Sequence, residues 1–309
     1  MLTIKNKVAI AQIGSLLFQP EESLAKIQAY AKEAAENGAK LVVFPEAFLG
    51  GYPKFSDFGI SLGSRSEEGR NEFSRYYSTA IAEYGEEHQA LEKLAQELNI
   101  HLVTGVVEKS GKTLYCSVFF FGPSGYMGKH RKLLPTALER CVWGNGDGST
   151  MATFETSELG TIGAAICWEN YMPLYRTHLY SQGIQLYLAP TVDDRDAWIS
   201  TMKHIAVEGR CFVISACQYI TGENFPEGHP MREKHGKNVL IRGGSCVIDP
   251  FGKVLMEPNY EGEKLLYADV NTEECIRGKF DLDVVGHYSR PDVFTLTVDT
   301  SIKETVVRK

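Results

Sequence analysis

The stretch GAKLVVFPE at residues 38–46 returns later in the chain as GIQLYLAPT at 183–191, with glycine, leucine and proline in the same places. In each copy a glycine suited to ending a helix precedes a short apolar run that predicts a buried strand. Two further segments, 117–128 and 245–256, each begin with serine, carry proline and glycine near the middle, and predict β-hairpins. The repetition predicts two structurally related halves rather than a short-period repeat array.

Apolar runs and amphipathic stretches alternate on both sides of these segments. The first half predicts strands at 8–13, 41–46 and 100–108, helices at 22–38 and 88–99, and a long polar segment at 50–86. The second half predicts strands at 160–167, 184–190 and 211–218, and helices at 173–183 and 197–210. Each half therefore supplies one sheet and one pair of helices.

A sheet with helices on one face must bury its other face. Packing the two sheets against each other predicts an α/β fold, a four-layer α-β-β-α sandwich formed as a single domain by residues 1–309. The alternative is a doubly wound parallel sheet. It is less favoured because the hairpins imply antiparallel strands and the sequence has no G-x-G-x-x-G or full G-x-x-x-x-G-K-[ST] phosphate-binding motif.

Composition excludes several classes of partner. The 309 residues are 43% hydrophobic and 23% charged, as is ordinary for a globular enzyme, and the net charge is −7. An acidic chain without a basic patch is not expected to bind nucleic acid or a membrane surface. The N-terminus has no signal-peptide pattern, and the seven cysteines are scattered without a C-x-x-C pair. We therefore expect a cytoplasmic protein without disulfide bonds.

Three polar residues stand where predicted strands end. Glu46 follows VVFP, Lys132 follows the first hairpin, and Cys167 follows AAI. A thiol, a carboxylate and an ammonium together suit covalent acyl chemistry, with a nucleophile, a proton acceptor and a stabilising cation. Taken singly, each also has a structural interpretation. Glu46 and Lys132 would be solvated surface charges, and Cys167 a buried core thiol.

Other catalytic centres find little support. The eight histidines show no H-x-x-x-H or H-E-x-x-H spacing, and His229 and His235 lie in a loop where we expect them to face solvent rather than to bind metal. A Ser-His-Asp hydrolase is disfavoured because the G-x-S-x-G match in the sequence, GISLG at 59–63, lies within the polar segment at 50–86, where no strand is predicted before it. The six cysteines other than Cys167 are interpreted as core or surface residues.

Longer motifs surround the three polar residues. They are FPE at 44–46, HRKLLPTALER at 130–140, VWGNGDG at 142–148, CWENYMPLYR at 167–176 and GHYSRPDVF at 286–294. Through them the chain resembles the nitrilase branch of the carbon–nitrogen hydrolase superfamily. The resemblance implies the sandwich fold, a Glu-Lys-Cys triad on Glu46, Lys132 and Cys167, and no metal or organic cofactor. It also implies that Glu139 helps to orient the lysine and the substrate.

The residues after the cysteine refine this expectation, because Trp168 and Glu169 resemble nitrile- or cyanide-hydrolysing members. We expect a nitrilase that forms a thioimidate on Cys167 and releases acid and ammonia. The alternatives are an amidase, a cyanide-converting hydrolase or a non-catalytic thiol-bearing binding protein. Trp168 would wall the site or anchor the core, and Glu169 would accept backbone N–H groups. Tyr52 and Trp143 are expected to line the pocket.

The predicted helices at 173–183 and 197–210 lie on the outside of the sandwich and carry many large apolar residues. These are Tyr175, Leu179 and Tyr180 in the first helix, and Trp198, Met202 and Ile205 in the second. At a period of 3.6 residues only part of each set is expected to face the sheet. The remainder, together with the family's pairing of these helices, predicts a homodimer or a larger even-numbered homo-oligomer.

Overall fold

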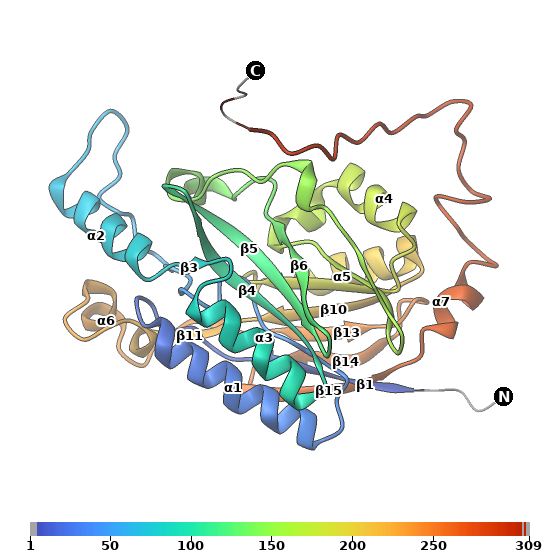
Figure 1. The fold of residues 1–309 in the computed structure, drawn as a ribbon, viewed down its shortest axis with the longest axis horizontal. Helices are drawn as coiled ribbons and strands as arrows, with labels where there is room; N and C mark the ends of the chain where they lie inside the picture. Colours follow the sequence, from blue (N-terminus) through green and yellow to red (C-terminus); the bar gives the residue numbers. More distant parts are fainter. Residues whose placement is uncertain (1–4, 305, 307–309) are drawn as a thin grey trace.

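Two β-sheets lie face to face between two layers of helices in the computed structural model, which describes residues 5–304 and 306 (Figure 1). The first sheet contains β1 (Asn6–Gln12), β2 (Leu41–Val43), β3 (Ile81–Ala82), β4 (His101–Ser110), β5 (Thr113–Gly122), β6 (Gly125–Arg131) and β15 (Lys264–Val270). The second contains β7 (Phe154–Thr156), β8 (Gly160–Ala164), β9 (Leu186–Thr191), β10 (Phe212–Cys217), β13 (Ser245–Ile248) and β14 (Val254–Asn259). The predicted α-β-β-α sandwich is confirmed, and the doubly wound alternative is wrong.

The two sheets repeat one topology. In the first, β1, β2 and β4 run parallel, and the hairpin β5–β6 continues the sheet antiparallel beside β4. In the second, β8, β9 and β10 run parallel, and the hairpin β13–β14 follows in the same way beside β10. The repeated stretches 38–46 and 183–191 contain the equivalent central strands β2 and β9. Strand β15 then pairs antiparallel with β1 and joins the end of the second half to the first sheet.

Helices cover the outer face of each sheet. They are α1 (Pro20–Glu36) and α3 (Glu86–Leu98) on the first sheet, and α4 (Pro173–Ser181) and α5 (Trp198–Gly209) on the second (Figure 1). In β1, Ile10 points between the sheets, whereas Ala9 and Ala11 pack beneath the helices. Because both faces are buried there, the middle of the strand, residues 8–11, is an unbroken apolar run instead of alternating with polar residues.

The polar segment at 50–86 contains a helix that hydrophobic periodicity did not predict. Helix α2 (Glu67–Ser78) is capped at its N-terminus by Ser66, whose hydroxyl accepts a hydrogen bond from the Gly69 N–H at 3.0 Å. The negative charges of Glu67 and Glu68 in its first turn interact favourably with the positive end of the helix dipole and stabilise the helix. The helix is mostly polar and buries only Gly69 and Tyr76, so few apolar residues mark it in the sequence.

The expected apolar surface on α4 and α5 is wrong. Tyr175, Leu179, Tyr180, Trp198, Met202 and Ile205 are all buried within this one chain. In two of these residues, Tyr175 and Trp198, a polar atom forms a hydrogen bond that allows the side chain to be buried. The Tyr175 hydroxyl donates to the Ala164 carbonyl at 2.7 Å, and Trp198 Nε1 donates to Ser215 Oγ at 2.9 Å. The helices are shorter than predicted and pack closely on the sheet, so these residues leave no apolar face for a dimer.

The last described residues follow an extended path. After α7 (Glu273–Gly278), the chain crosses the side of the molecule near α4 without further helix or strand up to residue 304 (Figure 1). The Lys303 N–H donates to Asp147 Oδ2 at 2.8 Å, and the Asp299 carbonyl occupies the space in which a side chain at Gly148 would lie. Within the described part of the chain, no helix combines the length and hydropathy needed to span a membrane.

Candidate active site

The three polar residues singled out at strand ends meet at one end of the sandwich. Glu46 lies in the loop after β2, Lys132 directly follows β6, and Cys167 begins the short 3₁₀ helix η3 (Cys167–Tyr171) after β8. All three are buried, with relative exposures of 0%, 1% and 3%. The structure therefore excludes the interpretation of Glu46 and Lys132 as solvated surface charges.

The Lys132 ammonium bridges two carboxylates. Its Nζ lies 2.6 Å from Glu46 Oε1 and 2.9 Å from Glu139 Oε2. Burial alone would lower the pKa of Lys132, but the charge of Glu46 and the neighbouring Cys167, Cys116 and Glu139 outweigh it and raise the pKa well above its usual value. Lys132 is therefore a permanent cation at this site.

The Glu46 carboxylate is held by one oxygen and leaves the other without a partner. Oε1 accepts from Lys132, whereas Oε2 is buried with no hydrogen-bond partner among the described residues. Burial raises the pKa of Glu46, and the nearby Lys132 ammonium offsets part of that rise. The backbone is fixed as well, because Gln218 Nε2 donates to the Glu46 carbonyl at 2.7 Å. Oε2 is thus positioned to take up a proton.

The loop that carries Glu46 passes very close to β4. A side chain at Gly105 would place its Cβ 2.2 Å from the Pro45 carbonyl oxygen and 2.7 Å from Glu46 Cα. The backbone hydrogen bond from the Gly105 N–H to that carbonyl is 3.1 Å long. Only glycine permits this approach, which brings Glu46 into the space between the sheets.

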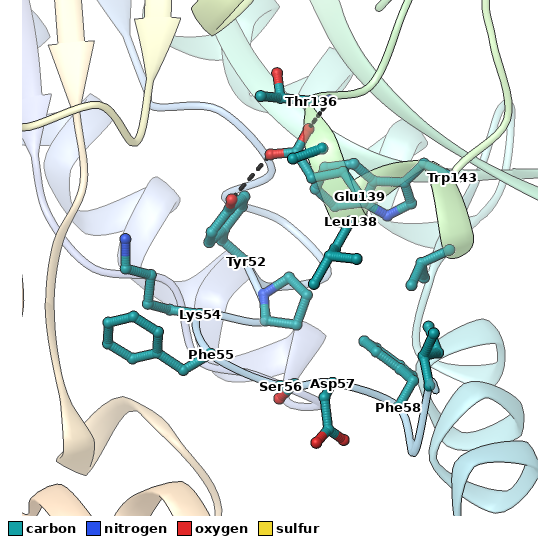
Figure 2. Close-up of a pocket in the computed structure, with 14 residues that line it drawn as sticks. Tyr52, Lys54, Phe55, Ser56, Asp57, Phe58, Thr136, Leu138, Glu139 and Trp143 are labelled. Carbon is teal, nitrogen blue, oxygen red and sulfur yellow. Dashed lines mark hydrogen bonds between the residues drawn. The ribbon is translucent and has the colours of Figure 1, made fainter. Parts of the chain in front are cut away.

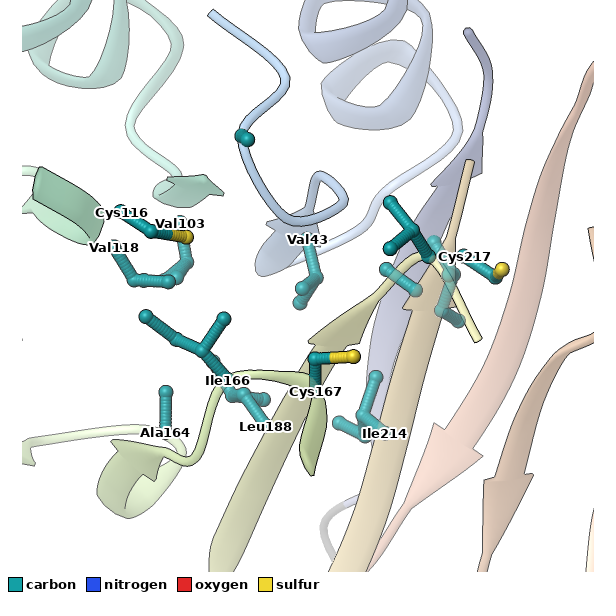
Figure 3. Packing of buried hydrophobic residues seen from close by; sticks show 14 of the residues in the cluster. Val43, Val103, Cys116, Val118, Ala164, Ile166, Cys167, Leu188, Ile214 and Cys217 are labelled. Atoms are coloured by element: carbon teal, nitrogen blue, oxygen red, sulfur yellow. The ribbon is translucent and has the colours of Figure 1, made fainter. Parts of the chain in front are cut away.

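Cys167 has a left-handed backbone conformation with φ of 50°, which is uncommon for a residue other than glycine. Figure 3 shows it in the core between the sheets, near Ile166, Leu188 and Ile214. Burial raises the pKa of the thiol, the Glu46 carboxylate raises it further, and Lys132 offsets part of the effect. The thiol is therefore protonated at neutral pH, and attack by its sulfur requires a base.

Glu169 holds the cysteine turn in place, as expected. Its two oxygens accept from the backbone N–H groups of Ile166 and Leu133, both at 2.7 Å. The same carboxylate contacts His130 Nε2 at 2.9 Å. One buried acid thus ties the backbone before Cys167 to the segment after Lys132.

Glu139 contacts Lys132 and is itself held by two further donors. The Thr136 N–H donates to its Oε2 at 2.7 Å, and the Tyr52 hydroxyl donates to its Oε1 at 2.9 Å. Tyr52 packs edge-on against Trp143, and the ring centroids are 5.9 Å apart. Glu139 lies in the short 3₁₀ helix η1 (Ala137–Cys141), where it closes the first turn.

Trp168 is not a core aromatic, because 44% of its surface is exposed. Its Nε1 donates to Asp193 Oδ2 at 2.9 Å, and the Arg195 guanidinium lies over its ring at 4.9 Å. Arg195 also forms an ion pair with Asp193. The expectation that Trp168 walls the site is consistent with this placement, whereas no sequence motif pointed to Asp193 and Arg195.

A pocket of about 200 Å³ opens onto Cys167 and is lined by Trp168 and Asp193, among others. A second pocket of about 330 Å³ adjoins it (Figure 2). The two have common walls, formed by Tyr52, Lys54, Thr136 and Glu139. As expected, Tyr52 and Trp143 both line the larger pocket, together with Phe55, Phe58, Leu138 and Val142. The reacting group and the rest of a substrate thus have separate spaces.

Cys116 lies in the core, as expected, and its Sγ also lies 3.5 Å from Glu46 Oε1. The expectation for the two loop histidines is wrong. His229 does not face solvent, since only 11% of its side chain is exposed and its ring packs against Phe225. His235 is also partly covered and stacks on Phe55. Within residues 5–304 and 306, no three His, Cys, Asp or Glu side chains are grouped to hold a metal ion.

Comparisons with known proteins agree with this geometry. Residues 7–280 match the carbon–nitrogen hydrolase family. The chain is 51% identical over 306 residues to the aliphatic nitrilase of Sinorhizobium fredii (strain HH103), covering 99% of each protein. It is 48% identical over 308 residues to nitrilase 2 of Arabidopsis thaliana, covering 97% of this chain and 90% of the plant protein. The solved structure of Saccharomyces cerevisiae Nit3, a member of branch 10 of the nitrilase superfamily, has a TM-score of 0.69 at 21% identity, covers 92% of this chain and 96% of its own, and supports the fold.

Proposed function

The chain belongs to the carbon–nitrogen hydrolase family, and we propose from this that it is a nitrilase, which hydrolyses an organic nitrile to a carboxylic acid and ammonia. The observation that carries the proposal is the buried cluster in which Lys132 Nζ lies 2.6 Å from Glu46 and 2.9 Å from Glu139, next to the Cys167 thiol. About half of the residues are identical to those of named nitrilases over nearly the whole chain, which supports a nitrile rather than an amide as the substrate.

The first step forms a covalent bond to sulfur. Glu46 accepts the thiol proton while Cys167 Sγ attacks the nitrile carbon, and the nitrile nitrogen gains a proton to give a thioimidate. The raised pKa of Glu46 suits this exchange, because a base with a pKa closer to neutrality both accepts and returns a proton. The Lys132 ammonium stabilises the negative charge that develops on nitrogen.

Hydrolysis then uses two water molecules. The first, deprotonated by Glu46, adds to the thioimidate carbon and gives a tetrahedral intermediate that carries hydroxyl, amino and sulfur groups. Protonation of the amino group releases ammonia and leaves a thioester on Cys167. The second water cleaves the thioester to the acid and restores the thiol. If sulfur leaves before ammonia, the product is the amide.

An ammonia-release assay over a panel of nitriles and amides, with chromatographic analysis of products, tests the proposal. We expect acid and ammonia from nitriles and only slow turnover of amides. Preferential turnover of amides or of cyanide would identify an amidase or a cyanide-converting hydrolase instead. Mass spectrometry of Cys167 during turnover tests for the covalent intermediate. A chain with no turnover of any compound would be a binding protein.

We also propose that residues 1–309 form one catalytic domain, because β15 completes the sheet that contains β1. A cytoplasmic location agrees with the seven unpaired cysteines. The proposed homodimer or larger even-numbered oligomer needs a contact other than the buried residues of α4 and α5. Exposed apolar residues on the C-terminal segment, Phe280, Tyr288, Phe294 and Ile302, suit such a contact. Light scattering that gave an active species of 34.4 kDa would contradict an oligomer.

A further inference from the structure

The charged residues that line the pocket at Cys167 are not all neutralised. They are Lys54, Glu139, Asp193, Asp194 and Arg195. Each of the three carboxylates has a cation within 4.0 Å. Glu139 pairs with Lys132 and Asp193 with Arg195, while Asp194 pairs with Arg242 at 3.8 Å.

Lys54 differs from the other charged residues of this pocket. Among the residues that the structure describes, its ammonium forms no ion pair and no hydrogen bond, and the centroid of the Phe55 ring lies 5.0 Å from Nζ. The residue is partly buried and lines both the pocket at Cys167 and the larger adjoining pocket. In Figure 2, its side chain extends in the same direction as that of Tyr52 and away from Asp57, the nearest acid in sequence.

An ammonium placed in this way favours an anionic partner. The pocket walls exclude part of the water around Lys54, which strengthens its attraction for a negative charge. A short nitrile at Cys167 whose carbon chain extends toward Lys54 would fit this space, because both residues line a pocket of about 200 Å³. A carboxylate at the other end of a short chain would lie within reach of the ammonium.

We propose that Lys54 binds a carboxylate of the substrate, so that the preferred substrates are short aliphatic nitriles that carry a carboxylate at the opposite end. This inference rests on the proposed nitrilase activity and specifies its substrate class. The nitrile reaches Cys167, the aliphatic chain lies along Tyr52, and the carboxylate meets Lys54. Lys54 then contributes mainly to substrate binding, because the carboxylate does not change during the reaction.

The alternative to this proposal is that Lys54 only offsets the negative charge of Glu46 and Glu139 that Lys132 does not neutralise. That role would affect every nitrile alike. A pair of substrates with the same shape and different charge separates the two. The anion 4-cyanobutanoate and the neutral 4-nitrobutanenitrile form such a pair, since a nitro group has nearly the shape of a carboxylate.

The experiment compares kcat/KM for both nitriles in the wild type, Lys54→Met, Lys54→Arg and a control, Lys112→Met, in the exposed turn between β4 and β5. We expect the wild type to prefer 4-cyanobutanoate. Lys54→Met should lose about 10- to 100-fold on that substrate, mainly through KM, and change less than about twofold on the neutral one. Lys54→Arg should keep most of the preference, and Lys112→Met should match the wild type.

Four outcomes would overturn the inference while leaving the nitrilase proposal intact. Three of them are equal use of the two nitriles by the wild type, equal losses on both in Lys54→Met, and an unchanged preference in Lys54→Met. The fourth is turnover of neither nitrile by a wild type that hydrolyses other nitriles. The absence of activity on every nitrile would instead contradict the proposed function itself. Retained turnover of 4-nitrobutanenitrile shows that a variant is folded.

Discussion

The Cys116 Sγ lies 3.5 Å from Glu46 Oε1, the same oxygen that accepts the hydrogen bond from Lys132 at 2.6 Å. Two donors therefore converge on one oxygen, and Oε2 of the carboxylate has no hydrogen-bond partner in the described part of the chain. Cys116 is buried on β5, so its thiol limits the rotation of the Glu46 side chain, which comes from the loop after β2. This contact links a second cysteine to the proposed general base.

Replacing Cys116 should change the pH dependence of the reaction. A thiol that donates to Glu46 favours the ionised carboxylate, so Cys116→Ala should raise the already elevated pKa of Glu46 further. Glu46 must be ionised to accept a proton. The acid limb of kcat/KM should therefore lie above pH 4.5 in the wild type and move up by roughly half a unit in Cys116→Ala.

Cys116→Ser keeps a donor and should leave the acid limb close to that of the wild type. The control is Cys246→Ala, which removes a buried thiol on β13, away from the site. Rate profiles from acid to neutral pH measure all three. An unchanged limb in Cys116→Ala, or an equal shift in Cys246→Ala, would show that Cys116 serves packing alone.

The fold and the three central site residues could be predicted because local patterns encode them. The strands of 38–46 and 183–191 are buried on both faces, so each appears in the sequence as an unbroken apolar run. Glu46 and Cys167 stand out because a charge or a thiol ends an apolar run, whereas Lys132 lies in the basic stretch KHRK and stands out through the motif HRKLLPT. The resemblance to a known family implies that these three residues act together as a triad.

The contacts that could not be predicted depend on pairing across the fold. Cys116 approaches Glu46 only because β4 and β5 pair in a register that sets Cys116 opposite Val107. The expectation for Tyr175 was wrong because period alone does not show that its hydroxyl reaches the Ala164 carbonyl and allows the whole ring to be buried. Asp193 and Arg195 carry no motif, and only the path of the chain after β9 brings them to Trp168.

Cys167→Ala should abolish turnover without unfolding the protein. The substitution removes the proposed nucleophile, and alanine carries the same backbone cost as cysteine in the left-handed conformation at φ of 50°. We expect ammonia release to fall by roughly a thousandfold or more, with an unchanged circular dichroism spectrum. A variant that retained a tenth of the activity would show that another group attacks the nitrile.

Lys132→Arg should be nearly as damaging as Lys132→Met. The ammonium is fully enclosed between Glu46 and Glu139, with the Trp143 ring centroid 6.0 Å from Nζ, so the larger planar guanidinium does not fit. We expect kcat to fall about 100-fold or more in both variants. Steady-state kinetics, with Lys112→Arg as the exposed control, measure the effect. An arginine variant within about threefold of the wild type would mean that charge alone suffices at this position.

The last prediction concerns stability and begins from a buried ion cluster outside the site. Glu108 on β4 accepts from Lys129 Nζ at 2.6 Å, from Arg131 Nη2 at 2.6 Å and from Ser117 Oγ at 2.7 Å, and its side chain is 1% exposed. Burial raises the pKa of Glu108, but the hydrogen bonds from Arg131 and the charge of Lys129 outweigh this and lower the pKa below 4.5. The cluster therefore holds β4 to the strands that precede Lys132.

A carboxyl group with a lowered pKa in the folded state stabilises the protein above its unfolded pKa, and this contribution is lost as the pH falls through the folded value. Glu108→Gln removes the charge and leaves Arg131 without its carboxylate partner. We expect the free energy of unfolding to fall by about 3 kcal/mol at pH 7. The difference from the wild type should shrink at acidic pH, where Glu108 becomes protonated. Urea unfolding at several pH values measures it, with the exposed Glu155→Gln as control. A loss that stayed constant down to the acid transition would mean that Glu108 contributes by packing and not by its charge.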